Sequence, residues 1–277
     1  MTLKNKLTAL FGLALFLSCA TNPFTGQKTM AFVSNDQLFP AAFQQYNQFL
    51  SDNKVVTGTA QAEMITRVGQ RIAVAAERYL TANGHHGYLK DYQWEYHLVD
   101  DETVNAWCMP GGKIVFYTGI LPVAENETAV AAIMGHEVAH ALANHGQQRM
   151  SAAYIQQGVA VAGNIALANN QQTLDIFNQS YGIVSNVGGM LPFSRSHETE
   201  ADQIGIYLMA IAGYNPIEAA ELWKRMKAKS GGQAPPEFMS THPSNDSRIA
   251  NLQALAPQAA AEAHKFGVTS FRSISKY

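Results

Sequence analysis

Residues 129–145 constrain the chain more than any other segment, because they are almost wholly apolar and yet include His136, Glu137 and His140. Side chains four positions apart lie on one face of an α-helix, so the two imidazoles can point at one metal ion. Glu137 lies about 100° around the helix from His136, near enough to take a proton from water at that metal without binding it. An apolar helix is expected to be buried, where histidines and carboxylates need partners. The segment therefore predicts a buried metal site with Glu137 as general base.

The alternative explanation of this motif is a solvated helix face with two ordinary histidines, which fits poorly with the apolar neighbours. A catalytic zinc takes three protein ligands and keeps one position open, so a third ligand is needed elsewhere. Glu198 and Asp202 lie four positions apart on a predicted helix, so both carboxylates share a face, whereas Glu200 points in another direction. One carboxylate can bind the metal while the other accepts the second N–H of a ligating imidazole. Without the first motif, a solvated acidic turn at a helix start would explain these acids equally well.

The composition is that of an enzyme-sized globular chain. Its 277 residues are 47% hydrophobic and 14% charged, enough for one catalytic domain with extensions or for two small domains. The formal net charge is −2, which gives no reason to expect a nucleic-acid partner.

The N-terminus has the layout of a secretory signal. Lys4 and Lys6 precede an apolar run at residues 7–17, which is too short to span a membrane. The run ends at Cys19, whose surroundings resemble a bacterial lipobox, so we expect Cys19 to be lipid-modified; a simple cleaved signal and a retained anchor are the alternatives. Cys108 would then be the only remaining thiol, and it is better explained as a small buried hydrophobe than as a nucleophile.

Periodicity predicts an α+β chain that is mainly helical. Helices are expected at residues 37–50, 59–82, about 125–150, 196–212 and 217–229, with a last helix opening near 241–249. Strands are expected at residues 92–99, 103–109 and 113–118, as a small antiparallel sheet next to the helix that contains His136. Residues 151–190 are predicted to form a helical pair against the active site rather than a membrane span, because polar residues interrupt the apolar positions.

Four motifs in order make the chain resemble the Ste-type CaaX-protease and Oma-like family of zinc metallopeptidases, most closely small secreted bacterial members that are LoiP-, YcaL- or BepA-like. The motifs are NAWCMPGGK at 105–113, HEVAH at 136–140, SRSHETEADQIG at 194–205, and THPS at 241–244 with Arg248. The resemblance implies a zincin-like metallopeptidase domain. It also implies one Zn²⁺ per chain ligated by His136, His140 and Glu198, with Glu137 as the catalytic base and Asp202 orienting a ligand.

The same resemblance gives His242 a role as a further catalytic residue, or as a fourth zinc ligand that gates the site. The alternative for His242 is a plain helix-start histidine before Pro243. The expected organisation is a signal peptide at 1–18, a lipid-anchor tether and N-terminal helix at 19–58, the zinc metallopeptidase domain at 59–257, and a C-terminal tail at 258–277.

The predicted function is a zinc metalloendopeptidase of the bacterial cell envelope that cleaves unfolded or misassembled proteins. An extended polypeptide substrate is expected to pair with one strand by backbone hydrogen bonds. The residues of that strand are Asn105, Ala106, Trp107, Cys108 and Met109. We expect a periplasmic enzyme anchored through Cys19, in the outer rather than the inner membrane because Ala20 follows the cysteine. A chaperone-like zinc lipoprotein without proteolysis and a metal-dependent cell-wall peptide hydrolase are the alternatives; the physiological substrate and the oligomeric state stay open.

Overall fold

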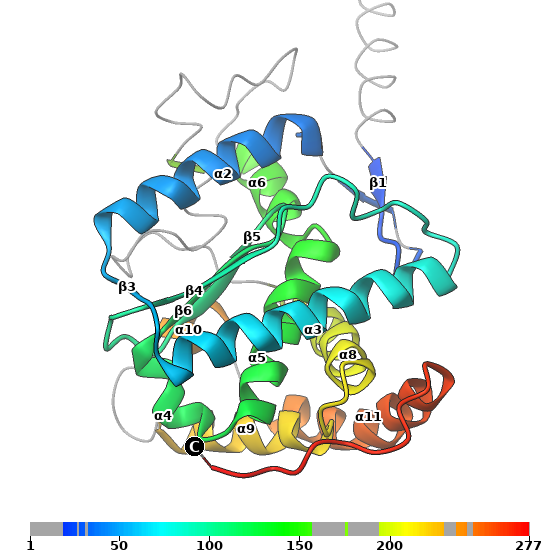
Figure 1. Cartoon of the computed structure of the whole chain (residues 1–277). Coiled ribbons are helices and arrows are strands. Elements are labelled where there is room, and N and C mark those ends of the chain that lie inside the picture. Colours follow the sequence, from blue (N-terminus) through cyan, green and yellow to red (C-terminus); the bar gives the residue numbers. More distant parts are fainter. Residues whose placement is uncertain are drawn as a thin grey trace, which may run out of the picture.

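The computed structural model describes residues 19–26, 28–30, 33–156, 175–176, 194–229, 237–242 and 246–276 (Figure 1). The predicted signal peptide and most of the predicted helical pair at 151–190 lie outside these residues. The described elements are β1 (Cys19–Thr21), β2 (Lys28–Met30), α2 (Asn35–Asp52), β3 (Val55–Val56), α3 (Ala60–Ala82), β4 (Glu95–Val99), β5 (Ala106–Met109), β6 (Lys113–Tyr117), η1 (Thr118–Ile120), α4 (Leu121–Ala124), α5 (Glu127–Leu142), α6 (His145–Gln156), α8 (Arg195–Ile211), α9 (Ile217–Lys229), α10 (Glu237–Thr241) and α11 (Asp246–Lys265). Among the described helices, none is long and apolar enough to cross a membrane.

The fold is mainly helical, as predicted, but its sheet is mixed rather than antiparallel. The strand order is β3-β4-β6-β5, in which β4 and β6 run parallel while the other pairs are antiparallel. The turn between β5 and β6 contains Gly111 and Gly112, both at positive φ, which favours a tight hairpin. The hairpin inserts β6 beside β4 and leaves β5 as an edge strand. Strand patterns indicate that hairpin but not which of its strands meets β4, and this is why the prediction was wrong.

Helices cover both faces of the sheet. Trp107, Met109 and Val115 pack with α2, whereas Cys108 and Ile114 lie in the larger core with α3 and α5. In Figure 1, α2 and α3 accordingly lie on opposite sides of the strands. Because successive side chains point to opposite faces, every residue of β5 and β6 is buried. The sheet is therefore an inner layer, with α5 directly against it.

α5 and α8 touch backbone to backbone where they cross. A Cβ built on Gly135 would lie 2.7 Å from the carbonyl oxygen of Gly205, and one built on Gly205 would lie 2.8 Å from the amide nitrogen of His136. Only glycine allows two helices to come this close. The crossing places the acidic start of α8 beside His136, so it positions the candidate site.

Two helix boundaries differ from the predictions. The predicted helix at 125–150 is two helices, α5 and α6, separated at Asn144, which has a φ of 58° that a regular helix cannot contain. α11 continues through Pro257 to Lys265, so the residues expected to be a tail begin inside a helix. Proline removes one hydrogen bond, but buried residues on both sides, including Ala256 and Ala259, hold the helix on the core.

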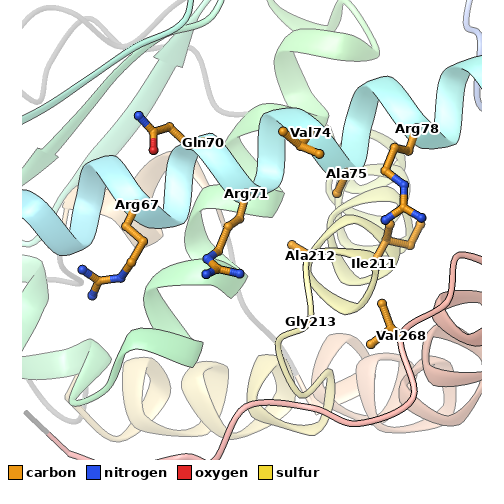
Figure 2. A pocket seen from close by; sticks show the side chains of 10 residues that line it. All are labelled: Arg67, Gln70, Arg71, Val74, Ala75, Arg78, Ile211, Ala212, Gly213 and Val268. Atoms are coloured by element: carbon orange, nitrogen blue, oxygen red, sulfur yellow. The ribbon is translucent and has the colours of Figure 1, made fainter.

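Both ends of the described chain pack on the helical body. In the segment expected to be a tether, β1 and β2 pair as an antiparallel hairpin, and Asn22 after β1 is 1% exposed. At the other end, Arg78 donates a hydrogen bond to the carbonyl of Phe266 at 2.5 Å, and the amide of Arg272 donates to Gly213 at 3.0 Å. Figure 2 shows the hollow of about 460 Å³ that this C-terminal segment leaves between α3 and the end of α8. Arginine side chains from α3 line it.

Candidate metal centre

Four potential metal ligands meet in one buried cluster: His136, His140, Glu198 and His242. Their ligand atoms lie within 4.8 Å of one another. His136 Nε2 is 3.0 Å from His140 Nε2, and Glu198 presents one oxygen to each of them at 3.4 Å. Ligands of a tetrahedral zinc lie about 3.3 Å apart, so two imidazoles and a carboxylate at these distances fit zinc.

Local structure explains why these side chains converge. His136 and His140 are one helical turn apart on α5, which is capped by Asn126 accepting a hydrogen bond from the amide of Ala129 at 2.8 Å. Glu198 lies in the first turn of α8. Every residue of α5 from Thr128 onward is buried, as the apolar sequence predicts. The face of α5 that contains His136 and His140 therefore faces the protein interior.

Glu137 lies next to the cluster without joining it. Its side chain is buried, and Oε1 has no hydrogen-bond partner among the described residues; His242 Nε2 lies 3.3 Å from it. Burial raises the pKa of Glu137, although the nearby His242 and His136 oppose that rise. A buried carboxylate oxygen left without a hydrogen bond beside a metal cluster is suited to accept a proton from water.

Asp202 of α8 and Arg248 of α11 support the cluster from two helices. Asp202 Oδ1 lies 3.1 Å from His136 Nδ1, the position expected of a residue that orients a ligand. Arg248 contacts both carboxylates: Nε lies 2.6 Å from Asp202 Oδ2, and Nη1 lies 2.6 Å from Glu198 Oε2. Its guanidinium also stacks 3.6 Å from the ring centre of Trp223. Arg248 thus compensates two buried negative charges, a role that no sequence spacing indicated.

Burial and hydrogen bonding have opposite effects on the pKa of His136. Burial disfavours the charged imidazole, but hydrogen bonds to Asp202 and Glu198 outweigh it and raise the pKa of His136 to about 9. Burial instead lowers the pKa of His140, which stays neutral. Without a metal, His136 is therefore protonated at neutral pH while His140 is not.

His242 lies between the metal ligands and the base. Its Nδ1 is 3.2 Å from His136 Nε2 and 3.0 Å from Glu198 Oε1, while its Nε2 faces Glu137. The residue directly follows α10, which is fixed at the start of β5 by a hydrogen bond from the amide of Phe238 to the carbonyl of Val104 at 3.1 Å. His242 can therefore fill a fourth ligand position.

The strand expected to bind substrate forms β5, at the edge of the sheet and against α5. Asn105, just before it, donates a hydrogen bond to Glu237 of α10 at 3.0 Å. Cys108 is a buried free thiol whose pKa is raised by burial and by the charge of Glu137. Cys19, the predicted lipid-modified residue, begins β1.

Sequence reasoning missed a second group beside His140. Glu200 does point away from the metal ligands, but it does not face solvent: its Oε2 lies 2.8 Å from His145 Nε2. His145 in turn lies against His140. Nothing in the sequence indicated that His145 supports a ligand.

The sequence matches Peptidase family M48 over residues 59–256. The chain belongs to this family. It is 39% identical to the mitochondrial metalloendopeptidase OMA1 of Schizosaccharomyces pombe over 62% of this chain and 49% of that protein. It is 25% identical to human OMA1 over 90% of this chain and 48% of that protein, and 24% identical to the beta-barrel assembly-enhancing protease of Yersinia pestis over 85% and 47%. The chain spans about half the length of these relatives.

These matches confirm the expected metallopeptidase family and its general Oma-like character. They do not single out small bacterial secreted members, because mitochondrial and bacterial relatives both appear. The cluster of His136, His140, Glu198 and His242 agrees with the family's use of a metal.

Proposed function

We propose that this chain is a zinc-dependent endopeptidase that hydrolyses peptide bonds in unfolded or misassembled proteins of the bacterial cell envelope. The observation that supports it most is a buried set of potential metal ligands next to a carboxylate oxygen of Glu137 that has no hydrogen bond among the described residues. Zinc held by His136, His140 and Glu198 would polarise the scissile carbonyl and lower the pKa of water. Glu137 takes the proton of the attacking water and returns it to the leaving amine.

The proposed substrate is a polypeptide in extended form. β5 is an edge strand next to α5, and an edge strand can bind an extended chain through backbone hydrogen bonds with little demand on sequence. All four residues of β5 are buried, and α10 lies against the strand's N-terminal end. Substrate entry therefore requires α10 to move away from that end.

The proposed role of His242 follows from its place on the segment that would move. With its Nδ1 3.0 Å from Glu198 and 3.2 Å from His136, it completes a four-ligand set and leaves no open position for water. Displacing α10 removes His242 from the cluster and exposes the start of β5 in the same movement. The enzyme accordingly rests in a closed state that substrate opens.

We place the enzyme in the periplasm, anchored through lipid-modified Cys19 to the outer membrane rather than the inner. The support is the charged and apolar pattern before Cys19 and the bacterial relatives named as beta-barrel assembly-enhancing proteases. The polypeptide substrate and the membrane are the partners of this proposal, and no nucleic acid is among them.

A cleavage assay on reduced, unfolded casein tests the proposal. Wild type should cleave casein in a chelator-sensitive way, and Glu137→Gln should keep its zinc but lose about 10²- to 10⁴-fold in rate. His242→Ala should change the rate without abolishing zinc binding. Zinc-loaded wild type that leaves casein intact would favour the chaperone-like alternative, and solubilisation of peptidoglycan instead would favour a cell-wall hydrolase.

A further inference from the structure

The two zinc-binding histidines of α5 are supported by different parts of the chain. His136 contacts the carboxylate of Asp202 directly, within the peptidase core. His140 is supported through a longer chain of contacts: its Nδ1 lies 2.9 Å from Nδ1 of His145, and Nε2 of His145 lies 2.8 Å from Glu200 Oε2. His145 is completely buried, so these ring nitrogens have no alternative in bulk water.

Only one proton arrangement satisfies this chain of contacts when a metal is bound. His140 presents Nε2 to the other ligands, so that nitrogen must be unprotonated and the proton must lie on Nδ1. Nδ1 then donates to His145 Nδ1, which leaves the proton of His145 on Nε2. That nitrogen faces a carboxylate, which is an acceptor. The sequence His140, His145, Glu200 therefore fixes the tautomer that zinc requires.

Glu200 is itself held by the N-terminal hairpin. Its Oε1 accepts hydrogen bonds from Asn22 Nδ2 at 2.7 Å and from Thr25 Oγ1 at 2.8 Å. The turn that presents these donors is fixed in two ways: Asn22 Oδ1 accepts the amide of Phe24 at 2.8 Å, and the Phe24 ring stacks on Tyr79 of α3 with ring centres 5.4 Å apart. The residues that hold Glu200 are thus remote from it in sequence and close to Cys19.

We propose that His145 and Glu200 are positioning residues for the zinc ligand His140, and that the N-terminal hairpin sets the metal affinity of the site by holding Glu200 through Asn22 and Thr25. This inference rests on the proposed zinc site but not on proteolysis. It makes residues 19–26 a functional part of the metal centre. Any change that lifts the hairpin away from α8 removes the donors on Glu200 and weakens zinc binding.

Zinc affinity, measured on the full chain by competition with a chromophoric chelator, tests the proposal. Glu200→Gln should weaken zinc binding about 10- to 100-fold, the effect expected when the partner of a ligating histidine is lost. Thr25→Val replaces the hydroxyl of an exposed residue by a methyl group, so the protein should fold normally and bind zinc more weakly than wild type, by a smaller factor than Glu200→Gln. Thr199→Ala, on the exposed side of α8 next to Glu200, is the matched control and should bind zinc like wild type.

The thermal midpoint of the zinc-free protein separates positioning from plain structural support. If Glu200→Gln and Thr25→Val lower that midpoint but leave the zinc dissociation constant unchanged, the proposal is overturned. If Glu200→Gln does not fold, Thr25→Val alone decides. Casein cleavage by the wild type, measured in parallel, keeps this result distinct from the proposed function. If the variants bind zinc more weakly but the wild type cleaves no casein, the proposed proteolysis is refuted and the positioning role stands.

Discussion

At the scale of single residues, charge decides how the site takes up its metal. Glu198 and Asp202 contribute two buried negative charges, and Arg248 contributes one positive charge in contact with both. In the metal-free protein, the protonated His136 supplies a second positive charge. A protonated imidazole has no free lone pair for a metal, so zinc can bind His136 only by displacing a positive charge.

The expelled charge should be the proton of His136, which gives a pH prediction. The pKa of His136 is raised to about 9 in the metal-free cluster, so below that pH zinc displaces a proton, and its apparent affinity should fall about tenfold for each unit of decreasing pH. Above about pH 9, the affinity should level off. His140 adds no such dependence because its pKa is lowered. Titration calorimetry in two buffers of different ionisation enthalpy should detect about one proton released per zinc at pH 7.5.

Asp202→Asn is the informative variant for this prediction. It removes the carboxylate that raises the pKa of His136, so less than one proton should be released at pH 7.5. Zinc uptake by wild type without proton release at pH 7.5 would show that His136 is already neutral.

At the scale of elements, the crossing of α5 and α8 controls the geometry of the site. Replacing glycine by alanine inside a helix normally stabilises it by about 1 kcal/mol. Gly205→Ala should do the reverse, lowering the free energy of unfolding by about 1–3 kcal/mol, because the new methyl would lie 2.8 Å from the amide nitrogen of His136. Zinc affinity should fall as well, since separating the helices moves Glu198 away from His140.

Urea unfolding and the chelator competition assay measure the two effects of Gly205→Ala. Thr199→Ala on the exposed face of the same helix is the control and should change neither quantity. A stabilised Gly205→Ala protein with wild-type zinc affinity would mean that the helices can separate at no cost to the site.

How well the sequence predicts an element depends on whether the interactions that form it are local in sequence. Periodicity located α3 and α9 within one residue, and the spacing of His136 and His140 gave a shared helical face. The break at Asn144 was missed because its neighbours continue a helical pattern and only the backbone geometry reveals it. The parallel pairing of β4 with β6 was missed because pairing partners are not encoded within either strand.

The same reasoning applies to the candidate site. The sequence could indicate His136, His140 and Glu198 as candidate ligands because the two histidines lie one helical turn apart and the order of four motifs pointed to the carboxylate; the structure brings these candidates together. Glu200 and Arg248 were not assigned roles because the residues they contact lie far away in sequence; Asn22 and Glu200, for example, are 178 positions apart. His145 is only five positions from His140, but the carboxylate that completes its contacts, Glu200, is 55 positions away. Such contacts depend on how whole elements pack.

At the scale of the whole molecule, the two ends of the described chain contact different parts of the protein. The N-terminal hairpin contacts Glu200 and through it the metal cluster. The segment after α11 instead packs along α3 and the C-terminal end of α8, around the hollow in Figure 2. Ile211, which lines that hollow, is thirteen positions from Glu198 on α8, or about 20 Å along the helix axis. Changes at the two ends should therefore be separable.

Phe266→Ala tests that separation at the C-terminal end. The half-buried ring stacks on Tyr79 at 6.2 Å between centres, with the Arg78 guanidinium 5.6 Å from its centre, so its loss should destabilise the fold by about 1–2 kcal/mol. Zinc affinity should stay at the wild-type value, in contrast to Thr25→Val at the hairpin. Lys265→Ala, with a 71% exposed side chain, is the matched control and should leave stability nearly unchanged. A loss of zinc affinity in Phe266→Ala would instead mean that Tyr79, on which both Phe266 and Phe24 of the hairpin stack, couples the C-terminal segment to the hairpin and through it to the metal centre.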